Sequence, residues 1–202
     1  EMALRSLAVD KCTIEYLRAH PKATIVALAE GFQTSFWRLD KAVPGAQFRW
    51  ISVDLPPVIE LRERLLPASE RITNIGQSAL DYSWMDRVDA SEGVFITAEG
   101  LLMYLQPDEA MDLIRQCAKR FPGGQMFFDL PPTILKKVAP KGIRAPKRYR
   151  VPPLPSSLSI ETPPLAMVML SPSFNSSNST SPVSESVMMV PTGIFSVMSS
   201  PA

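Results

Sequence analysis

Three carboxylates and one glycine turn each follow an apolar stretch of the chain, either at once or after a short loop. Asp54 and Glu99 each follow an apolar run, Asp81 ends the loop after a third, and Gly31 lies in the turn after a fourth. A carboxylate can accept hydrogen bonds from ribose hydroxyls or pair with an ammonium group, and a turn before a helix exposes backbone N–H groups to a ligand. This set of residues predicts a site for a nucleotide-type ligand.

Glu99 is the most informative of these residues, because it follows the apolar segment Gly93 to Ala98 without a gap. A carboxylate at the end of a buried strand is costly to desolvate unless it has a partner. A ligand ammonium would satisfy it, and the alternative is a turn whose own backbone N–H groups do so. Tyr104, a few residues later, either places its phenol over the same site or packs half-buried.

The glycine turn is poor by the standard of dinucleotide-binding loops. Leu28-Ala-Glu-Gly31 has one glycine where the G-x-G-x-x-G fingerprint has three. A pyrophosphate needs close backbone approach at several points, whereas a nucleoside with a small charged tail does not. Each residue also has a structural alternative: an ordinary tight turn for Gly31, a turn cap for Asp54 and a helix cap for Asp81.

The segments that must position these residues alternate between strand-like and helix-like patterns. The expected strands are Thr24 to Leu28, Phe48 to Val53, Arg71 to Ile75, Gly93 to Ala98 and Gln125 to Leu130; the expected helices are Met2 to Ala19, Thr34 to Val43, Val58 to Leu66, Tyr82 to Val88 (a short helix or turn) and Pro107 to Arg120. This order predicts an α/β fold with a Rossmann-like, doubly wound, mostly parallel sheet. All the candidate loops then open at the carboxyl edge of that sheet.

One helix of this set carries a specific prediction about its faces. In Val58 to Leu66, the apolar residues Val58, Leu61 and Leu65 are expected to pack on the sheet. The charged residues between them, which include Arg62, are expected to form the solvated face.

Composition excludes several classes of function. With 202 residues, 46% hydrophobic content and a net charge of +1, the chain suits one α/β domain and offers no global attraction to nucleic acid or membranes. The two cysteines, Cys12 and Cys117, fall in expected helices, and no leader or membrane-length apolar run is evident, which favours a reduced, cytoplasmic protein. His20 lies opposite the crevice and no Cys/His cluster fits zinc, so no metal is expected. Oligomeric state stays open.

The last third of the chain differs from the rest in composition. Residues 1–135 form the expected ligand-binding domain, residues 136–155 a basic, proline-containing linker, and residues 156–202 a Ser/Pro-rich tail. Lys136 to Arg150 is favoured as a solvated linker over a nucleic-acid contact, because only Tyr149 is available there to stack bases. Irregular structure is favoured for the tail, with strands at Leu165 to Leu170 and Val187 to Val190 as the alternative.

Several motifs resemble the leucine carboxyl methyltransferase superfamily, and most closely its branch of polyketide-type, tetracenomycin-like O-methyltransferases. They are Leu28-Ala-Glu-Gly-Phe-Gln-Thr34, Val53-Asp-Leu-Pro56, Ala79-Leu-Asp81, Ala98-Glu-Gly-Leu-Leu-Met-Tyr-Leu105 and Arg120-Phe-Pro-Gly-Gly124. The resemblance covers roughly Ala3 to Pro155. It implies the fold of a class I methyltransferase that uses S-adenosylmethionine.

The resemblance also implies a role for each matching position. Ala29, Glu30 and Gly31 would lie against the methionine part of the cofactor, and Asp54 with Leu55 would hold the ribose. Leu80 and Asp81 would frame the adenine, and Glu99 and Gly100 would meet the α-amino group. The resemblance names no catalytic residue, and Tyr104 stays the one candidate, from its place in the chain alone.

The chain departs from the family pattern in three places. The usual Leu-Gly-x-Gly-Leu-Asp-Thr-Arg reads Leu28-Ala-Glu-Gly-Phe-Gln-Thr-Ser35 here, without the first glycine, the aspartate or the arginine. The family's N-terminal helices, which supply an arginine for the cofactor carboxylate, are expected to be missing, and the tail is unlike the family. The expected fold is therefore incomplete at both ends. The expected activity is transfer of a methyl group to a carboxylate or phenolic oxygen of a small molecule, and the alternative is a cofactor-binding remnant or interaction protein without turnover.

Overall fold

The computed structural model describes residues 2–130, residue 155 and residues 165–169, and it has a single sheet within these ranges. The strands are β1 (Thr24–Leu28), β2 (Arg49–Asp54), β3 (Ile72–Gly76), β4 (Val94–Ala98), β5 (Gln125–Asp129) and β6 (Leu165–Met169), in the order β3-β2-β1-β4-β5-β6. The first five are parallel, and β6 is antiparallel to β5. The predicted doubly wound, mostly parallel sheet is confirmed.

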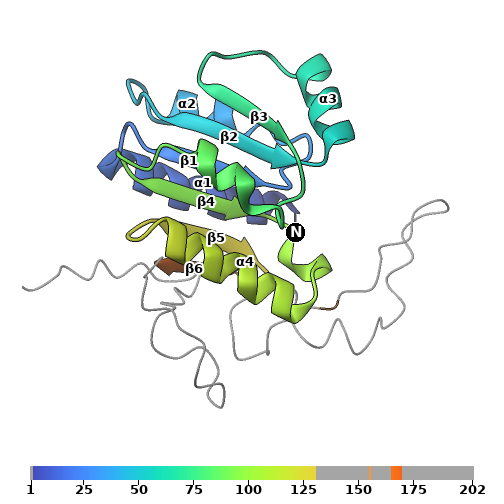
Figure 1. Ribbon diagram of the computed structural model, residues 1–202. Helices are drawn as coiled ribbons and strands as arrows, with labels where there is room; N and C mark the ends of the chain where they lie inside the picture. The colour runs from blue at the N-terminus through green and yellow to red at the C-terminus, as the bar shows by residue number, and fades with distance from the viewer. Residues whose placement is uncertain (1, 131–154, 156–164, 170–202) are drawn as a thin grey trace, which may run out of the picture.

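Helices cover both faces of this sheet. Those on one face are α1 (Met2–Ala19), α2 (Ser35–Ala42) and α3 (Pro56–Leu65), and those on the other are the 3-10 helix η1 (Tyr82–Arg87) and α4 (Pro107–Arg120). In Figure 1, α4 runs in front of the sheet and α1 behind it. All five residues of β1 and of β4 are buried, as expected of strands that are covered on both faces. Each face therefore has its own apolar cluster, with Ile25 in one and its neighbour Val26 in the other.

The direction of α1 matters for the site. Since α1 precedes β1 and runs antiparallel to it, the first turn of α1 lies at the arrowhead end of the strands (Figure 1). Side chains from that turn can therefore reach the loops that follow the strands. The predicted bounds of α1 and α4 agree with those observed.

The predicted faces of α3 are wrong. Its buried residues are Ile59 and Arg62, whereas Leu61 and Leu65 are 38% and 66% exposed. The physical reason is a carboxylate under the helix: Glu30, from the turn after β1, is buried and ion-paired with Arg62. Leaving a buried carboxylate without a cation costs more free energy than leaving the two leucines exposed to solvent.

The start of α4 follows local rules. Pro107 occupies its first turn, and the Gln106 backbone N–H donates to Glu109 Oε2 at 2.9 Å in a capping box. This helix buries Leu113, Ile114 and Cys117 and thereby closes the core on its face of the sheet.

Part of the predicted tail belongs to the sheet. Two segments of the tail had a strand as the alternative to irregular structure. One of them, Leu165 to Leu170, corresponds to β6, so the prediction of irregular structure is wrong for this segment. Val187 to Val190 and the basic stretch Lys136 to Arg150 lie outside the described residues, as do most of the predicted linker and tail.

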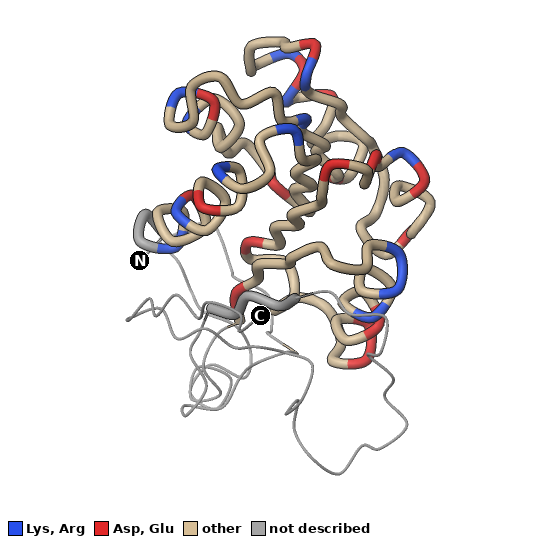
Figure 2. Tube along the Cα trace, turned by 90° about the vertical axis from the view of Figure 1, so that its left-hand side faces the viewer, with Lys and Arg blue, Asp and Glu red and all other residues tan. Residues whose placement is uncertain are grey.

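The described surface mixes both signs of charge. In Figure 2, acidic and basic residues are interspersed along the outer helices and loops. Within residues 2–130 and 165–169, no helix combines the length and apolar character that membrane crossing requires. Across the same residues, no group of three or more His, Cys, Asp or Glu side chains could hold a metal ion. Cys12 and Cys117 are both free thiols.

Candidate ligand site at the carboxyl edge of the sheet

The predicted loops lie along one edge of the sheet. Because β2, β1 and β4 are parallel and in close register, the residues that follow them emerge side by side; Leu28 pairs with Val53, and Ala27 with Thr97. The turn at Gly31, the Asp54-Leu55 pair and the Glu99-Gly100 pair therefore lie along one edge of the sheet, the edge at which open α/β sheets bind their ligands.

Asp54 closes the turn after β1. Its Oδ2 accepts a hydrogen bond from the Gly31 backbone N–H at 2.8 Å, and its Oδ1 accepts one from the Leu55 N–H at 2.8 Å. The side chain thus caps its own turn, as the structural alternative predicted, but each carboxylate oxygen keeps a further lone pair for a ligand hydroxyl. Leu55 beside it is 56% exposed, so an apolar surface flanks these oxygens.

Ala29 and Gly31 give the turn its shape. Both have positive φ values, +52° for Ala29 and +60° for Gly31. The left-handed region is costly for alanine and nearly free for glycine. Ala29 N–H nevertheless donates to Val53 O at 2.8 Å, so the neighbouring strand holds the strained residue in place.

The side chain of Glu30 is buried under α3 and not exposed at the carboxyl edge of the sheet. Its Oε2 lies 3.0 Å from Arg62 Nη2 and accepts hydrogen bonds from Ser52 Oγ at 2.7 Å and Trp50 Nε1 at 3.0 Å. Burial raises the pKa of Glu30, and the pair with Arg62 opposes that rise. Arg62 also donates through Nη1 to the carbonyls of Gly31 and Gln33. Glu30 therefore holds the turn to α3. Its Oε1 has no hydrogen-bond partner among the described residues, but the side chain is only 3% exposed and already has a cation in Arg62.

Glu99 belongs to a charge cluster in which the partly exposed Arg5 lies between Glu99 and Asp129. Arg5, in the first turn of α1, places Nε 3.6 Å from Glu99 Oε2 and Nη1 3.2 Å from Asp129 Oδ2. The side chains of Glu99 and Asp129 are only 7% and 10% exposed. The second Asp129 oxygen accepts a hydrogen bond from the Gly100 N–H. One cation is thus shared between two carboxylates at the ends of adjacent strands.

This cluster is not fully satisfied. Within the described part of the chain, neither Glu99 Oε2 nor Arg5 Nε has a hydrogen-bond partner, although both atoms are buried. Burial raises the pKa of Glu99, and Arg5 and a hydrogen bond from Gln33 counter the rise. The two readings made from the sequence, a ligand ammonium or backbone N–H groups, both omitted Arg5. Its Nε lies 3.6 Å from Glu99 Oε2, too far for a hydrogen bond, so Oε2 can still accept one from a ligand cation.

The remaining candidates have more ordinary surroundings. Asp81 caps η1, because its Oδ1 accepts from the Ser83 N–H at 3.2 Å and from Ser83 Oγ at 2.8 Å. Leu80 packs half-buried against the core. Tyr104 ends the 3-10 helix η2 (Leu102–Tyr104) and is 43% exposed.

The contacts of the candidate residues include Arg5, Asp129 and Arg62, which were not singled out in the sequence. Asp129 carried the same signal as Glu99, an acid after an apolar strand, and could have been found by it. Arg5 and Arg62 carried none, because the acidic partner of each is distant in sequence. Arg5 nevertheless places an arginine beside Glu99 from the first turn of α1.

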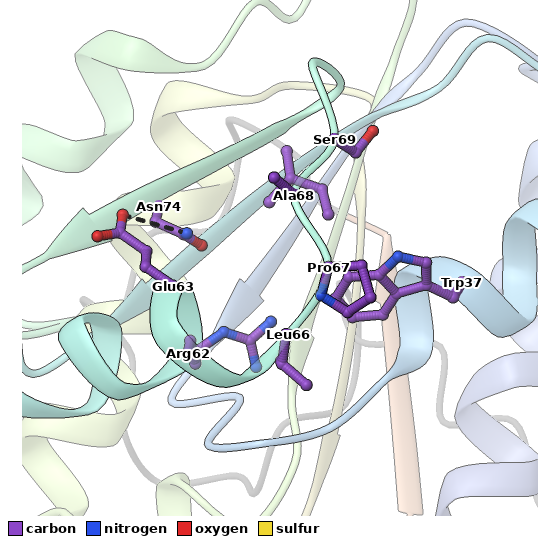
Figure 3. Close-up of a pocket in the computed structure, with 9 residues that line it drawn as sticks. Trp37, Arg62, Glu63, Leu66, Pro67, Ala68, Ser69 and Asn74 are labelled. Atoms are coloured by element: carbon purple, nitrogen blue, oxygen red, sulfur yellow. Dashed lines mark hydrogen bonds between the residues drawn. The ribbon is translucent and has the colours of Figure 1, made fainter.

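A pocket of about 190 Å³ lies between α2, α3 and β3. Its lining comes from α2, α3, the loop before β3 and β3 itself: Trp37, Arg62, Glu63, Leu66, Pro67, Ala68, Ser69, Ile72 and Asn74 (Figure 3). Arg62 is shared between this pocket and the turn after β1, because its Nη1 donates to the carbonyls of Gly31 and Gln33. None of the residues predicted to bind a ligand lines it.

Comparison with known proteins identifies the family of the chain. Residues 1–118 match the leucine carboxyl methyltransferase family. The chain is 34% identical over 128 residues to the tetracenomycin polyketide synthesis O-methyltransferase TcmP of Streptomyces glaucescens, with 63% of this chain and 46% of that protein covered. It is 32% identical over 148 residues to the S-adenosyl-L-methionine-dependent methyltransferase dpfgK of Gibberella zeae, with 66% and 48% covered. The chain thus spans about half the length of these curated relatives.

The fold has a solved counterpart. The structure of the S-adenosylmethionine-dependent methyltransferase SibL superposes with a TM-score of 0.52 at 14% sequence identity, covering 78% of this chain and 46% of that one. At this identity the likeness concerns the fold alone.

Proposed function

The chain belongs to the leucine carboxyl methyltransferase family, and on that premise we propose that it binds S-adenosylmethionine at the carboxyl edge of its sheet. We further propose that the protein transfers the methyl group to a carboxylate or phenolic oxygen of a small molecule. The relative from Streptomyces glaucescens, an O-methyltransferase of polyketide synthesis, supports an oxygen acceptor.

The observation that carries the proposal is the unsatisfied pair of Glu99 and Arg5. An amino-acid tail is a zwitterion, and it offers an ammonium to Glu99 and a carboxylate to Arg5. The buried Oε2 of Glu99 and Nε of Arg5 would both gain the partners that they lack among the described residues. Such charge-assisted hydrogen bonds are stronger than hydrogen bonds between neutral groups. The residues present therefore fit the tail of the cofactor.

The nucleoside would lie beside this tail, over the turn after β2. The free lone pairs of Asp54 are suited to the ribose hydroxyls, and the exposed Leu55 offers apolar contact to the sugar and base. Since Asp81 already bonds Ser83, we propose that the adenine is bordered by Leu80 and by the backbone around Asp81.

S-adenosylmethionine, when bound, supplies a methyl group on a sulfonium that is already a strong electrophile. What the protein contributes is placement of the acceptor in line with that methyl group and exclusion of water. A carboxylate acceptor needs no general base. Tyr104 lies on η2, five residues after Glu99 in the sequence, and its side chain is 43% exposed. We propose it as a residue that contacts the methyl acceptor.

Calorimetric titration with S-adenosylhomocysteine tests the binding step. Saturable binding with one site per chain is expected, and no heat or saturation would rule the proposal out. Transfer of a radiolabelled methyl group to small carboxylic acids and phenols tests the activity. Binding without transfer to any of them would favour the alternative, a cofactor-binding protein without turnover.

A further inference from the structure

The contacts of Arg5 are unequal, and the difference suggests which of them changes when a ligand binds. Arg5 Nη1 donates a hydrogen bond to Asp129 Oδ2 at 3.2 Å, whereas the approach of Nε to Glu99 at 3.6 Å is an ion pair without a hydrogen bond. Asp129 is therefore the firm anchor of the guanidinium, and Glu99 is the contact that can be exchanged.

Asp129 also fixes the loop that carries Glu99. Its Oδ1 accepts the hydrogen bond of the Gly100 N–H, and Gly100 has a φ of +68°. A Cβ atom at Gly100 would lie 3.3 Å from Arg5 Nη1, so the loop and the guanidinium are packed closely against each other. One carboxylate thus sets the positions of both groups that we assign to the ligand's tail.

We infer that Asp129 is a positioning residue that keeps Arg5 available to the carboxylate of an amino-acid tail. This inference rests on the proposed function. When the zwitterion enters, its ammonium takes the place of Arg5 at Glu99, and Arg5 turns its free N–H groups to the incoming carboxylate while Asp129 still holds Nη1. Guanidinium can do this because its five N–H donors form a rigid fork, so that one edge stays anchored while another binds.

Without the charge on Asp129, Arg5 has Glu99 as its remaining nearby anion and pairs with it fully. The tail of the ligand then meets a closed ion pair. A nucleoside without that tail does not depend on this pair, since Asp54 and Leu55 lie on a different strand end. The role of Asp129 therefore predicts a selective loss of affinity and not a general one.

The test compares two ligands on the full chain. S-adenosylhomocysteine has the amino-acid tail, and 5′-methylthioadenosine has the same nucleoside without it. In Asp129→Asn, which keeps an oxygen for the Gly100 N–H, we expect the affinity for S-adenosylhomocysteine to fall about tenfold to a hundredfold, the usual range for a lost charge-assisted contact. The affinity for 5′-methylthioadenosine stays within about twofold on the same scale. Asp40→Asn, which removes a charge on α2 outside the cluster, serves as the matched control and changes neither affinity.

Two results would overturn the inference: equal losses for both ligands, or no loss for either. If the wild-type chain bound neither ligand, the proposed function itself would fail, and that outcome is visible before any variant is made. Arg5→Lys provides a second test should Asp129→Asn not fold. Lysine keeps the charge but has no fork with which to hold Asp129 and a ligand carboxylate together. It gives the same selective loss, and an equal or absent loss again contradicts the role.

Discussion

The guanidinium of Arg62 and the carboxylate of Glu30 form an ion pair of 3.0 Å, with side chains only 2% and 3% exposed. This pair joins the middle of α3 to the turn after β1, the same turn whose Gly31 N–H bonds Asp54. It explains why α3 presents a charged residue to the sheet and leaves Leu61 and Leu65 in solvent.

Replacing Arg62 with methionine should strongly destabilise the fold. Glu30 would remain buried without its cation, and breaking one side of a buried pair costs about 3–5 kcal/mol. Urea unfolding followed by tryptophan fluorescence measures the loss. The double variant Glu30→Gln, Arg62→Met should recover part of it, because no buried charge then lacks a partner. As a control, Arg115→Met removes a partly exposed pair with Asp112 and should cost far less; equal costs for the two methionine variants would contradict the assigned role of the buried pair.

Replacing Ala29 with glycine should stabilise the protein. Ala29 has a φ of +52°, where glycine avoids about 1–2 kcal/mol of steric cost but loses more chain entropy on folding. A net gain of about 0.5–1 kcal/mol is expected in the free energy of unfolding. Ala27→Gly, in the buried strand β1, is the matched control and should lower stability. The turn would be less strained than described if both variants destabilised the protein alike.

Replacing Glu99 with glutamine should separate stability from binding. Burial raises the pKa of Glu99 in the folded state above its unfolded value, so the ionised side chain destabilises the fold once the pH exceeds the folded pKa. The neutral amide should therefore raise the melting temperature at neutral pH, while the affinity for S-adenosylhomocysteine falls at least about tenfold. Glu60→Gln, at an exposed position of α3, should change neither. A less stable Glu99→Gln variant that bound normally would refute both parts.

The affinity for S-adenosylhomocysteine should depend on pH through the same residue. A ligand ammonium prefers ionised Glu99, whose pKa lies above the ordinary value of 4.5. Binding should weaken as the pH is lowered through that raised pKa and should release a proton in the same range. Titrations between about pH 8 and about pH 5, in buffers of different ionisation enthalpy, measure both effects. Glu99→Gln should give a flat profile, and an equally flat wild-type profile would exclude Glu99 as the ammonium partner.

Much of the fold could be predicted from local patterns. Apolar runs such as Thr24 to Leu28 identify strands that are buried on both faces, and Pro107 with the acids after it marks the start of α4. The convergence of the loops at one edge then follows from the parallel order of the strands. The face of α3 could not be predicted in this way, because its buried residue Arg62 is chosen by Glu30 and not by the apolar period of the helix.

The candidate site, too, could be predicted only in part from local patterns. Asp54 and Glu99 were found because each ends a strand, and the end of a parallel strand has a known place in the sheet. Whether Asp54 bonds Gly31, or Asp81 only caps a helix, depended on geometry that the spacing of residues leaves open.

By itself, then, the sequence determined the order of strands and helices, the edge on which a ligand would sit and the family, since these depend on local apolar patterns and on short motifs. Only the tertiary structure decided which charges meet. Arg5 and Asp129 lie 124 positions apart, and their contact exists because α1 runs antiparallel to β1 and ends its first turn over the ends of β4 and β5. Which charges pair depends on their distance in space and not in sequence. The pairing matters most for buried charges, because a buried charge without a partner costs much free energy in surroundings of low polarity.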